Sequence, residues 1–251
     1  MTSARPAVSE RAERARSFEA AAADYERHRP DYPGQALRWA ADRLELEAGA
    51  RVLDVGAGTG KLTRGLVALG LDVVAVEPGG PMLEQLGVAV PEAEAHEGHA
   101  ESIPLPDESV DAGFAGQAYH WFDRGRALPD LHRVIRPGGG LALLWNWWNE
   151  RDPLQRELGR IVGFAGHRPF NEEELPGTPW FHEVGRTVVD SSEQTSPEGL
   201  VSRIATTSMF LTMDAAERER LLAEVRDLAS RSGDRFTMTR QTFVLAFARL
   251  S

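Results

Sequence analysis

The chain has no cysteine and a single lysine, and both shortages limit the chemistry open to it. Without cysteine there is no disulfide, no thiol nucleophile and no cysteine-ligated metal. The lone Lys61 is the only side chain that could form a Schiff base with a substrate. No run of about 18 apolar residues occurs, and the N-terminal segment lacks the apolar stretch of a secretory signal. We therefore expect a cytoplasmic protein that does not span a membrane.

Positive charge is also scarce in this sequence. It has 28 Lys and Arg against 38 Asp and Glu, which gives a formal net charge of −10. A protein that binds duplex DNA or long RNA needs a basic surface, because contacts to phosphates dominate the affinity. The 7 histidines show no metal-ligand spacing. We therefore expect no nucleic-acid partner and no metal.

Glycine, in contrast, is concentrated in one short stretch. The sequence DVGAGTGK (54–61) has glycine at every second position, directly after an apolar run. Such glycines mark backbone that bends sharply or lets a ligand approach closely. The dinucleotide pattern G-x-G-x-x-G fails because Lys61 stands where its third glycine is required. The P-loop pattern fails because Val55 replaces its first glycine and Leu62 replaces its Ser/Thr.

Apolar runs alternate with helical patterns around this turn. Strands are expected at 51–56, 72–77, 93–97, 110–119 and 139–146, and helices at 61–69, 81–87 and 126–135. Because these strands are apolar on both faces and are separated by helices, they predict βαβ units around a parallel sheet.

The pattern is less regular outside this core. Further helices are expected at 9–25, 34–46, within 197–211 and at 214–230, and further strands at 185–193 and 235–250. In the last expected strand, the apolar residues move from one face to the other near residues 240–242, which predicts a β-bulge at that point.

Glu77 ends the second expected strand and gives a further indication of the ligand. The glycine turn lies at the carboxyl end of the first strand, where open α/β sheets bind ligands. A carboxylate at Glu77 can accept hydrogen bonds from both hydroxyls of a ribose. Because no phosphate pattern is present, the glycines are suited to admit the amino-acid arm of a nucleoside. This combination resembles the class I S-adenosylmethionine-dependent methyltransferases.

Three further stretches are similar to motifs of the small-molecule branch of that family, and they occur in the same order. They are VEPGGPML (76–83), GHAESIPLPDESVD (98–111) and LHRVIRPGGG (131–140). The N-terminal sequence YERHRPDYP (25–33) is similar to the group around trans-aconitate methyltransferase. An ordered set of motifs is more specific than any one of them.

The resemblance implies an α/β fold: a Rossmann-like parallel sheet with a terminal antiparallel strand, helices on both faces, an N-terminal helical lid and a C-terminal helical insertion. One methyltransferase domain is expected over residues 1–251, with the lid at 1–33, a cofactor-binding core at 34–150 and the insertion over the acceptor site at about 195–232. The implied enzyme uses S-adenosylmethionine, releases S-adenosylhomocysteine and methylates a small organic acceptor by in-line displacement. A monomer or homodimer without a membrane partner is expected.

The positions that match the family's motifs give an expected cofactor site. The resemblance places Tyr25 and Arg29 near the methionine carboxylate, Ala100 and Glu101 around the adenine, and Gln117 as a further contact. The full expected set is Tyr25, Arg29, Asp54, Gly56, Ala57, Gly58, Gly60, Glu77, Pro78, Met82, Ala100, Glu101 and Gln117.

The stretch GQAYHWFD (116–123) ends the fourth expected strand, next to the expected position of the transferred methyl group. His120 is the candidate base or acceptor-positioning residue, because a neutral imidazole can take a proton near pH 7. A purely structural role for His120 is an open alternative. Trp121, Trp145 and Trp147 are expected to line the acceptor pocket, or alternatively to serve as packing residues.

Two other functions stay open at this point. A catalytically silent S-adenosylmethionine-binding regulatory protein would share the fold, although a broken glycine turn or the loss of Glu77 would be its expected mark. An NAD-dependent oxidoreductase would share the fold and the ribose-binding acid, but Lys61 interrupts its glycine fingerprint.

Overall fold

The computed structural model describes residues 26–163, 170, 172, 175–177 and 179–251. The chain divides into two compact units, each built from several segments. The first unit consists of Met1–Arg29, Glu150–Ala165 and Glu193–Met238. The second unit consists of Pro30–Asn149, Gly166–Ser192 and Thr239–Ser251. The helix expected at 9–25 lies outside the described residues.

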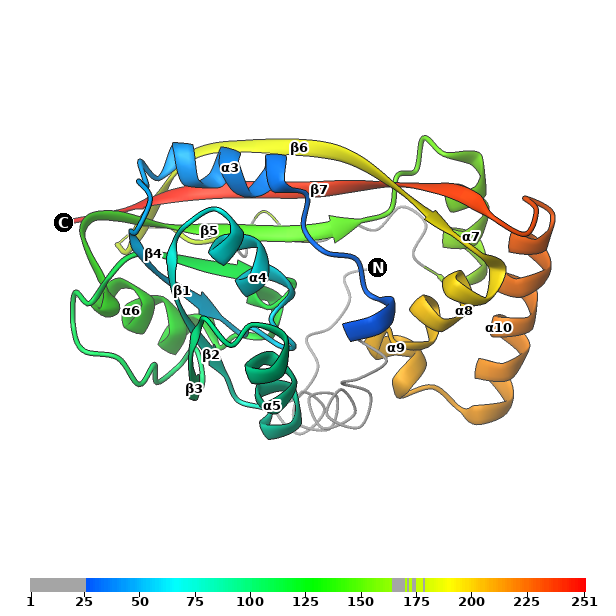
Figure 1. Cartoon of the computed structure of the whole chain (residues 1–251), viewed down its shortest axis with the longest axis horizontal. Helices are drawn as coiled ribbons and strands as arrows, with labels where there is room; N and C mark the ends of the chain where they lie inside the picture. Colours follow the sequence, from blue (N-terminus) through cyan, green and yellow to red (C-terminus); the bar gives the residue numbers. More distant parts are fainter. Residues whose placement is uncertain (1–25, 164–169, 171, 173–174, 178) are drawn as a thin grey trace. The chain divides into compact units, whose positions relative to one another are not determined.

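A seven-stranded sheet with the order β3-β2-β1-β4-β5-β7-β6 forms the second unit, and the last residues of β6 and the first of β7 belong to the first unit (Figure 1). Strands β3, β2, β1, β4 and β5 are parallel, whereas β7 runs antiparallel to β5. The strands are β1 (Arg51–Val55), β2 (Asp72–Glu77), β3 (Glu94–Glu97), β4 (Val110–Gly116), β5 (Ile135–Trp147), β6 (Phe181–Thr195) and β7 (Phe236–Arg249). The predicted fold class, a mostly parallel sheet with a terminal antiparallel strand, is confirmed.

Helices cover both faces of the sheet because successive residues of its buried strands point in opposite directions. On one face lie α3 (Gly34–Arg43), α4 (Lys61–Ala68) and α5 (Gly80–Ala89), and on the other lies α6 (Arg124–Val134). Val52 packs in the cluster of α3 and α4, while the next residue, Leu53, packs in the cluster of α6. This layering leaves the ends of the parallel strands as the place for a site.

The first unit contains α7 (Pro153–Ile161), α8 (Pro197–Ala205), α9 (Ser208–Leu211) and α10 (Ala215–Ser230). Three of these helices begin at a residue whose side chain accepts from the first backbone amides, namely Asp152, Ser196 and Asp214. Helix α7 was not expected from the sequence, although Asp152 followed by Pro153 is a typical helix start. No described helix is long and apolar enough to cross a membrane.

The β-bulge predicted near 240–242 is wrong. Strand β7 pairs with β5 without a break from Gln241, opposite Trp147, to Ala248, opposite Gly140. The change in apolar parity lies next to the boundary between Met238 and Thr239, where β7 passes from the first unit into the second. Phe236, Met238, Thr242 and Val244 are buried on one parity, and Leu245 and Phe247 of the other parity are also buried further along the strand, while the pairing with β5 stays regular.

Candidate active site

The candidate site lies at the carboxyl ends of β1, β2 and β4. Strand β1 has β2 on one side and β4 on the other, and the chain leaves β1 toward β2 but leaves β4 toward β5, in opposite directions across the sheet. Such a reversal of strand order opens a crevice at the carboxyl ends of the strands. The glycine turn, Glu77 and Gln117 all follow these ends.

The glycine turn is tied to the end of β2 by consecutive backbone amides. The N–H groups of Gly56 and Ala57 donate to the Val76 carbonyl at 2.8 and 3.2 Å. The next amide, Gly58 N–H, donates to Glu77 Oε2 at 2.9 Å, and Glu77 Oε1 accepts from Gly79 N–H at 3.0 Å. The Glu77 carboxylate therefore joins the glycine turn after β1 to the loop after β2.

The three glycines of the turn all have positive φ angles, but they have different surroundings. A Cβ atom on Gly56 would lie 2.6 Å from the Ala118 Cβ, and one on Gly60 would lie 3.1 Å from Leu86. A Cβ atom on Gly58, whose φ is +59°, would have no atom within 4 Å. Close neighbours explain why positions 56 and 60 require glycine. Gly58 instead faces open space that a ligand can fill.

Asp54 carries a buried carboxylate with one oxygen left without a partner. Its side chain is completely buried, and Thr63 Oγ1 donates to Asp54 Oδ2 at 2.6 Å. Asp54 Oδ1 is buried and has no hydrogen-bond partner. Burial raises the pKa of Asp54 to about 7, the negative charge of Glu77 adds to this rise, and the bonds from Thr63 oppose it. Such an oxygen can receive an N–H donor or a cation from a ligand.

Sequence reasoning missed Thr63, although a signal was present. Thr63 lies on α4 between the buried Leu62 and Leu66, so a polar side chain at this position is buried with them. A buried hydroxyl requires a partner, and the carboxylate of Asp54 is the one it has.

The loop after β3 is held by the two ends of α6. Glu101 Oε1 accepts from the Asp123 backbone amide at 2.6 Å, and Ala100 lies buried in the cluster under α6. Arg133 donates to the carbonyls of Ile103 and Leu105 at 3.0 and 2.8 Å. The segment predicted to surround the adenine therefore has a fixed backbone.

Strand β4 ends at Gly116, three residues earlier than predicted, because Gln117 adopts a φ of +55°. This conformation is unusual for a residue other than glycine. Its backbone amide donates to the Leu144 carbonyl at 2.9 Å, and its Nε2 donates to the Asn146 carbonyl at 2.9 Å. The short helix η1 (Tyr119–Trp121) follows, and the exposed ring of His120 lies 4.9 Å from that of Trp121.

The three tryptophans of the expected acceptor pocket have different environments. Trp145 is 1% exposed, and its ring lies 6.5 Å from Tyr119 and 5.0 Å from Phe170. Its indole Nε1 is buried without a hydrogen-bond partner. Trp121 is partly buried against the same core, and Trp147 is partly exposed at the end of β5. The structure thus gives Trp145 a packing role and leaves Trp121 and Trp147 accessible.

The other predicted residues are distributed over both units. Met82 is buried on α5, and Pro78 is exposed after β2. Arg29 belongs to the first unit, where it donates to the Thr206 carbonyl at 3.1 Å. Tyr25 lies outside the described residues. Within the described ranges, no group of three His, Asp or Glu side chains is placed to hold a metal ion.

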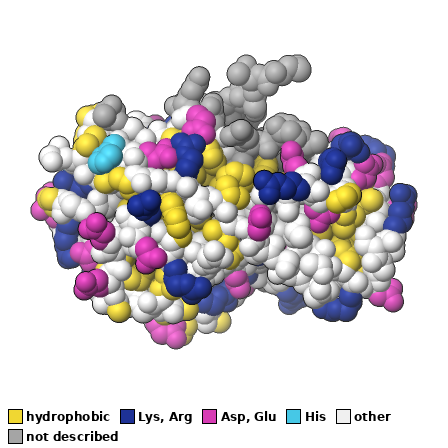
Figure 2. Space-filling view, turned by 90° about the horizontal axis from the view of Figure 1, so that it is seen from above, with side chains coloured by type: hydrophobic (Ala, Val, Ile, Leu, Met, Phe, Trp, Pro, Cys, Tyr) yellow, Lys and Arg dark blue, Asp and Glu magenta, His cyan; other side chains and the backbone are white. Residues whose placement is uncertain are grey.

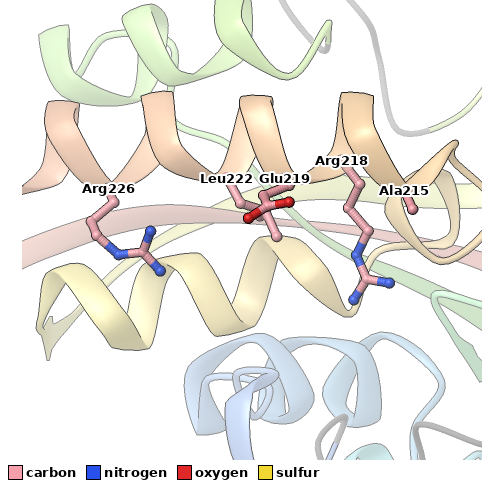
Figure 3. Close-up of a pocket in the computed structure, with 5 residues that line it drawn as sticks. All are labelled: Ala215, Arg218, Glu219, Leu222 and Arg226. Atoms are coloured by element: carbon pink, nitrogen blue, oxygen red, sulfur yellow. The ribbon is translucent and has the colours of Figure 1, made fainter.

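Neither the surface hollow nor the surface charge points to a further part of this site. A hollow of about 330 Å³ in the first unit is lined only by side chains of α10, and Arg218 and Arg226 extend from this helix (Figure 3). Of the described residues, none that was predicted for the site lines this hollow. On the face seen in Figure 2, acidic and basic side chains are interspersed rather than gathered by sign.

Comparisons with known proteins agree with this geometry. Residues 53–143 match the family model described as a methyltransferase domain. An uncharacterized methyltransferase of Mycobacterium tuberculosis is 46% identical over 212 residues, which cover 84% of this chain and 85% of the relative.

Solved structures show the same fold. A protein of Anaeromyxobacter dehalogenans, assigned as a type II methyltransferase, has a TM-score of 0.67 at 26% identity and covers 88% of this chain and 97% of its own. A phosphoethanolamine N-methyltransferase of Haemonchus contortus, in complex with S-adenosylhomocysteine, has a TM-score of 0.54 at 17% identity. It covers 98% of this chain and 61% of its own.

The pKa of Asp54 leads to a prediction about stability. Its pKa in the folded protein, about 7, lies above the usual value of 3.8, so the folded state binds a proton that the unfolded state has lost. The contribution of Asp54 to the free energy of unfolding is therefore fully present below pH 4 and is lost as pH rises through 7. Between pH 5 and pH 8 the wild type should lose on the order of 2–3 kcal/mol relative to Asp54→Asn. Urea unfolding of both proteins at the two pH values measures this difference, and parallel pH profiles would contradict it.

Proposed function

Because the chain belongs to the class I S-adenosylmethionine-dependent methyltransferases, we propose that it binds S-adenosylmethionine at the carboxyl ends of β1 and β2 and transfers the methyl group to a small organic acceptor. Three neighbouring features carry this proposal: the open space over Gly58, the carboxylate of Glu77 and the unpartnered oxygen of Asp54. Asp54 lies in β1 one residue before its end, Glu77 is the last residue of β2, and Gly58 lies in the turn that follows β1.

The residues present suit the cofactor in charge and in hydrogen bonding. An ionised carboxylate such as that of Glu77 only accepts hydrogen bonds, and it has about four acceptor sites. Glu77 accepts from the amides of Gly58 and Gly79, and as an acceptor-only group it is also suited to accept from the hydroxyls of a ribose. The open space at Gly58 allows close approach of the nucleoside, since no side chain occupies it.

Asp54 suits the amino-acid arm of the same cofactor. Its Oδ1 is a buried acceptor without a donor, and an ammonium group would supply both N–H donors and a positive charge. A nearby cation would also favour the ionised form of Asp54 and so oppose the rise in its pKa that burial causes. The glycine turn thus fits a nucleoside with a cationic arm better than it fits a phosphate.

When bound, S-adenosylmethionine supplies a methyl group already activated on its sulfonium. The protein has to hold the acceptor in line with the breaking bond and to exclude water. We propose that His120 takes a proton from the acceptor, because it follows β4 on an exposed helical turn beside Trp121. Trp121 and Trp147 are proposed to offer aromatic surface to the acceptor.

The first test concerns Glu77. Glu77→Ala removes the proposed ribose acceptor and the anchor of the Gly58 amide, so the affinity for S-adenosylhomocysteine should fall roughly tenfold or more. Isothermal titration calorimetry measures this change. The matched control is Glu94→Ala, at the amino end of β3, where the carboxylate pairs with Arg51 and His96 instead. Unchanged affinity in Glu77→Ala would remove the proposed cofactor site.

The second test compares two glycines that have similar local conformations but lie at different places in the fold. Gly58 and Gly138 both have positive φ and open space at the Cβ position, but Gly138 lies near the start of β5. Each alanine variant should lose roughly 1–2 kcal/mol of stability, because both place a Cβ in the left-handed region. Only Gly58→Ala should also weaken S-adenosylhomocysteine binding, by roughly tenfold. Equal affinities in the two variants would show that the open space at Gly58 holds no cofactor.

The third test concerns His120 and follows a screen of small organic acceptors with labelled S-adenosylmethionine. If His120 takes the proton, His120→Ala should lower the methylation rate by roughly 10²–10⁴-fold with little change in S-adenosylhomocysteine affinity. The variant should also lose the fall in rate at acid pH. His182→Ala, an exposed histidine on β6, is the control. A small loss of rate with a raised KM would instead assign His120 to acceptor positioning.

A further inference from the structure

Residues 30–32, which we call the strap, lie across the carboxyl ends of the central strands. Asp31 Oδ1 pairs with Lys61 Nζ and Arg64 Nη2 of α4, both at 3.3 Å. A Cβ atom on Gly116, the last residue of β4, would lie 2.5 Å from the Tyr32 hydroxyl. The strap therefore connects the helix after the glycine turn to the end of β4.

Asn146, near the end of β5, contacts both the strap and the residue that follows β4. Its Nδ2 donates to the carbonyls of Pro30 and Asp31 at 3.5 and 3.4 Å. Its backbone carbonyl accepts from Gln117 Nε2 at 2.9 Å. Its Oδ1 accepts from Thr242 Oγ1 at 2.7 Å. The side chain and the backbone carbonyl of Asn146 thus join its own strand β5 to the strap, to Gln117 and to β7.

Thr242 determines which way the Asn146 amide faces. It lies directly opposite Asn146 in the β5–β7 ladder and is completely buried. Because the Thr242 hydroxyl donates to Oδ1, the amide nitrogen of Asn146 is turned toward the strap. A buried hydroxyl costs free energy unless it is hydrogen-bonded, and the equally buried position 244 of the same strand is an apolar valine. The hydroxyl of Thr242 therefore serves this contact rather than core packing.

Gln117 supplies an independent sign that this region is functional. Its φ of +55° is uncommon for a residue with a side chain, and such strain persists where surrounding contacts fix the conformation. Here those contacts are two bonds to β5, from its backbone amide to Leu144 and from its Nε2 to Asn146. Strained residues of this kind gather at ligand sites.

We infer that Asn146 is a positioning residue for S-adenosylmethionine binding: oriented by Thr242, it holds the strap and the Gln117 side chain at the carboxyl end of β4. This inference rests on the proposed function, which places the cofactor beside the same strand ends. Asn146 acts through Gln117 and the strap. No local pattern in the sequence indicates this role, since the contacts of Asn146 with Pro30 and Thr242 join residues more than 90 positions apart.

Substitutions at both ends of the Thr242–Asn146 bond test this inference by titration with S-adenosylhomocysteine. Thr242→Val removes the hydroxyl at nearly constant volume and should weaken affinity about fivefold, the equivalent of one hydrogen bond. Thr242→Ser keeps the hydroxyl and should restore affinity to within about twofold of wild type. Asn146→Asp keeps the acceptor for Thr242 but turns an oxygen toward two carbonyls, so its affinity should fall at least as far.

Val244→Ala is the matched control for a general loss of stability, because Val244 is buried on the same strand and the same face. It should unfold at lower temperature yet bind S-adenosylhomocysteine like the wild type. If Asn146→Asp does not fold, the comparison of Thr242→Val with Thr242→Ser decides alone.

The possible results separate this inference from the proposed function. Wild-type affinity in Thr242→Val, or an equal loss in Val244→Ala, would overturn the role of Asn146. In either case a loss of affinity in Glu77→Ala would still support the cofactor site. Unchanged affinity in Glu77→Ala as well would overturn both.

Discussion

The site depends on one interaction, the pair of hydrogen bonds that the Glu77 carboxylate accepts from the amides of Gly58 and Gly79. These bonds hold the turn after β1 against the loop after β2, and the turn leads directly into α4. The carboxylate therefore shapes the backbone to which the cofactor is proposed to bind, in addition to its proposed contact with the ribose. Bonds from neutral amides to a charged acceptor are among the stronger hydrogen bonds in proteins, which suits this double use. Asp54 lies behind the same turn and is affected by the charge of Glu77, so the two acids act on one another.

Much of the fold was predictable from the sequence, because local patterns specify it. The apolar runs at 51–56 and 72–77 alternate with helical patterns, and the strands β1 and β2 fall on them within one residue. The glycine turn and Glu77 were found for the same reason, since each lies within a few residues of a strand end. Helix α7 was missed although the sequence contains a start signal for it, Asp152 before Pro153.

The remaining features depend on contacts between distant segments, which no local pattern contains. The predicted bulge in β7 was wrong because parity reports the surroundings of a strand as well as its pairing. The burial of Trp145 depends on Tyr119 and Phe170, so the sequence left open whether this tryptophan packs or lines a pocket. The roles of Asn146 and Thr242 depend on the antiparallel pairing of β5 with β7, which places them opposite each other. The expected roles of Arg29, Gln117 and His120 stay predictions.

The scarcity of lysine has a practical consequence for experiments on this chain. Lys61 is the first residue of α4, and its side chain is 11% exposed beside Asp31 of the strap. The entire sequence offers an amine-directed reagent one side-chain amine, besides the α-amino group at the N-terminus. Reductive alkylation with carbon-13 would place a single pair of isotopically labelled groups next to the glycine turn. Their resonance, once distinguished from that of the labelled N-terminal amine, would report on that turn without an engineered cysteine.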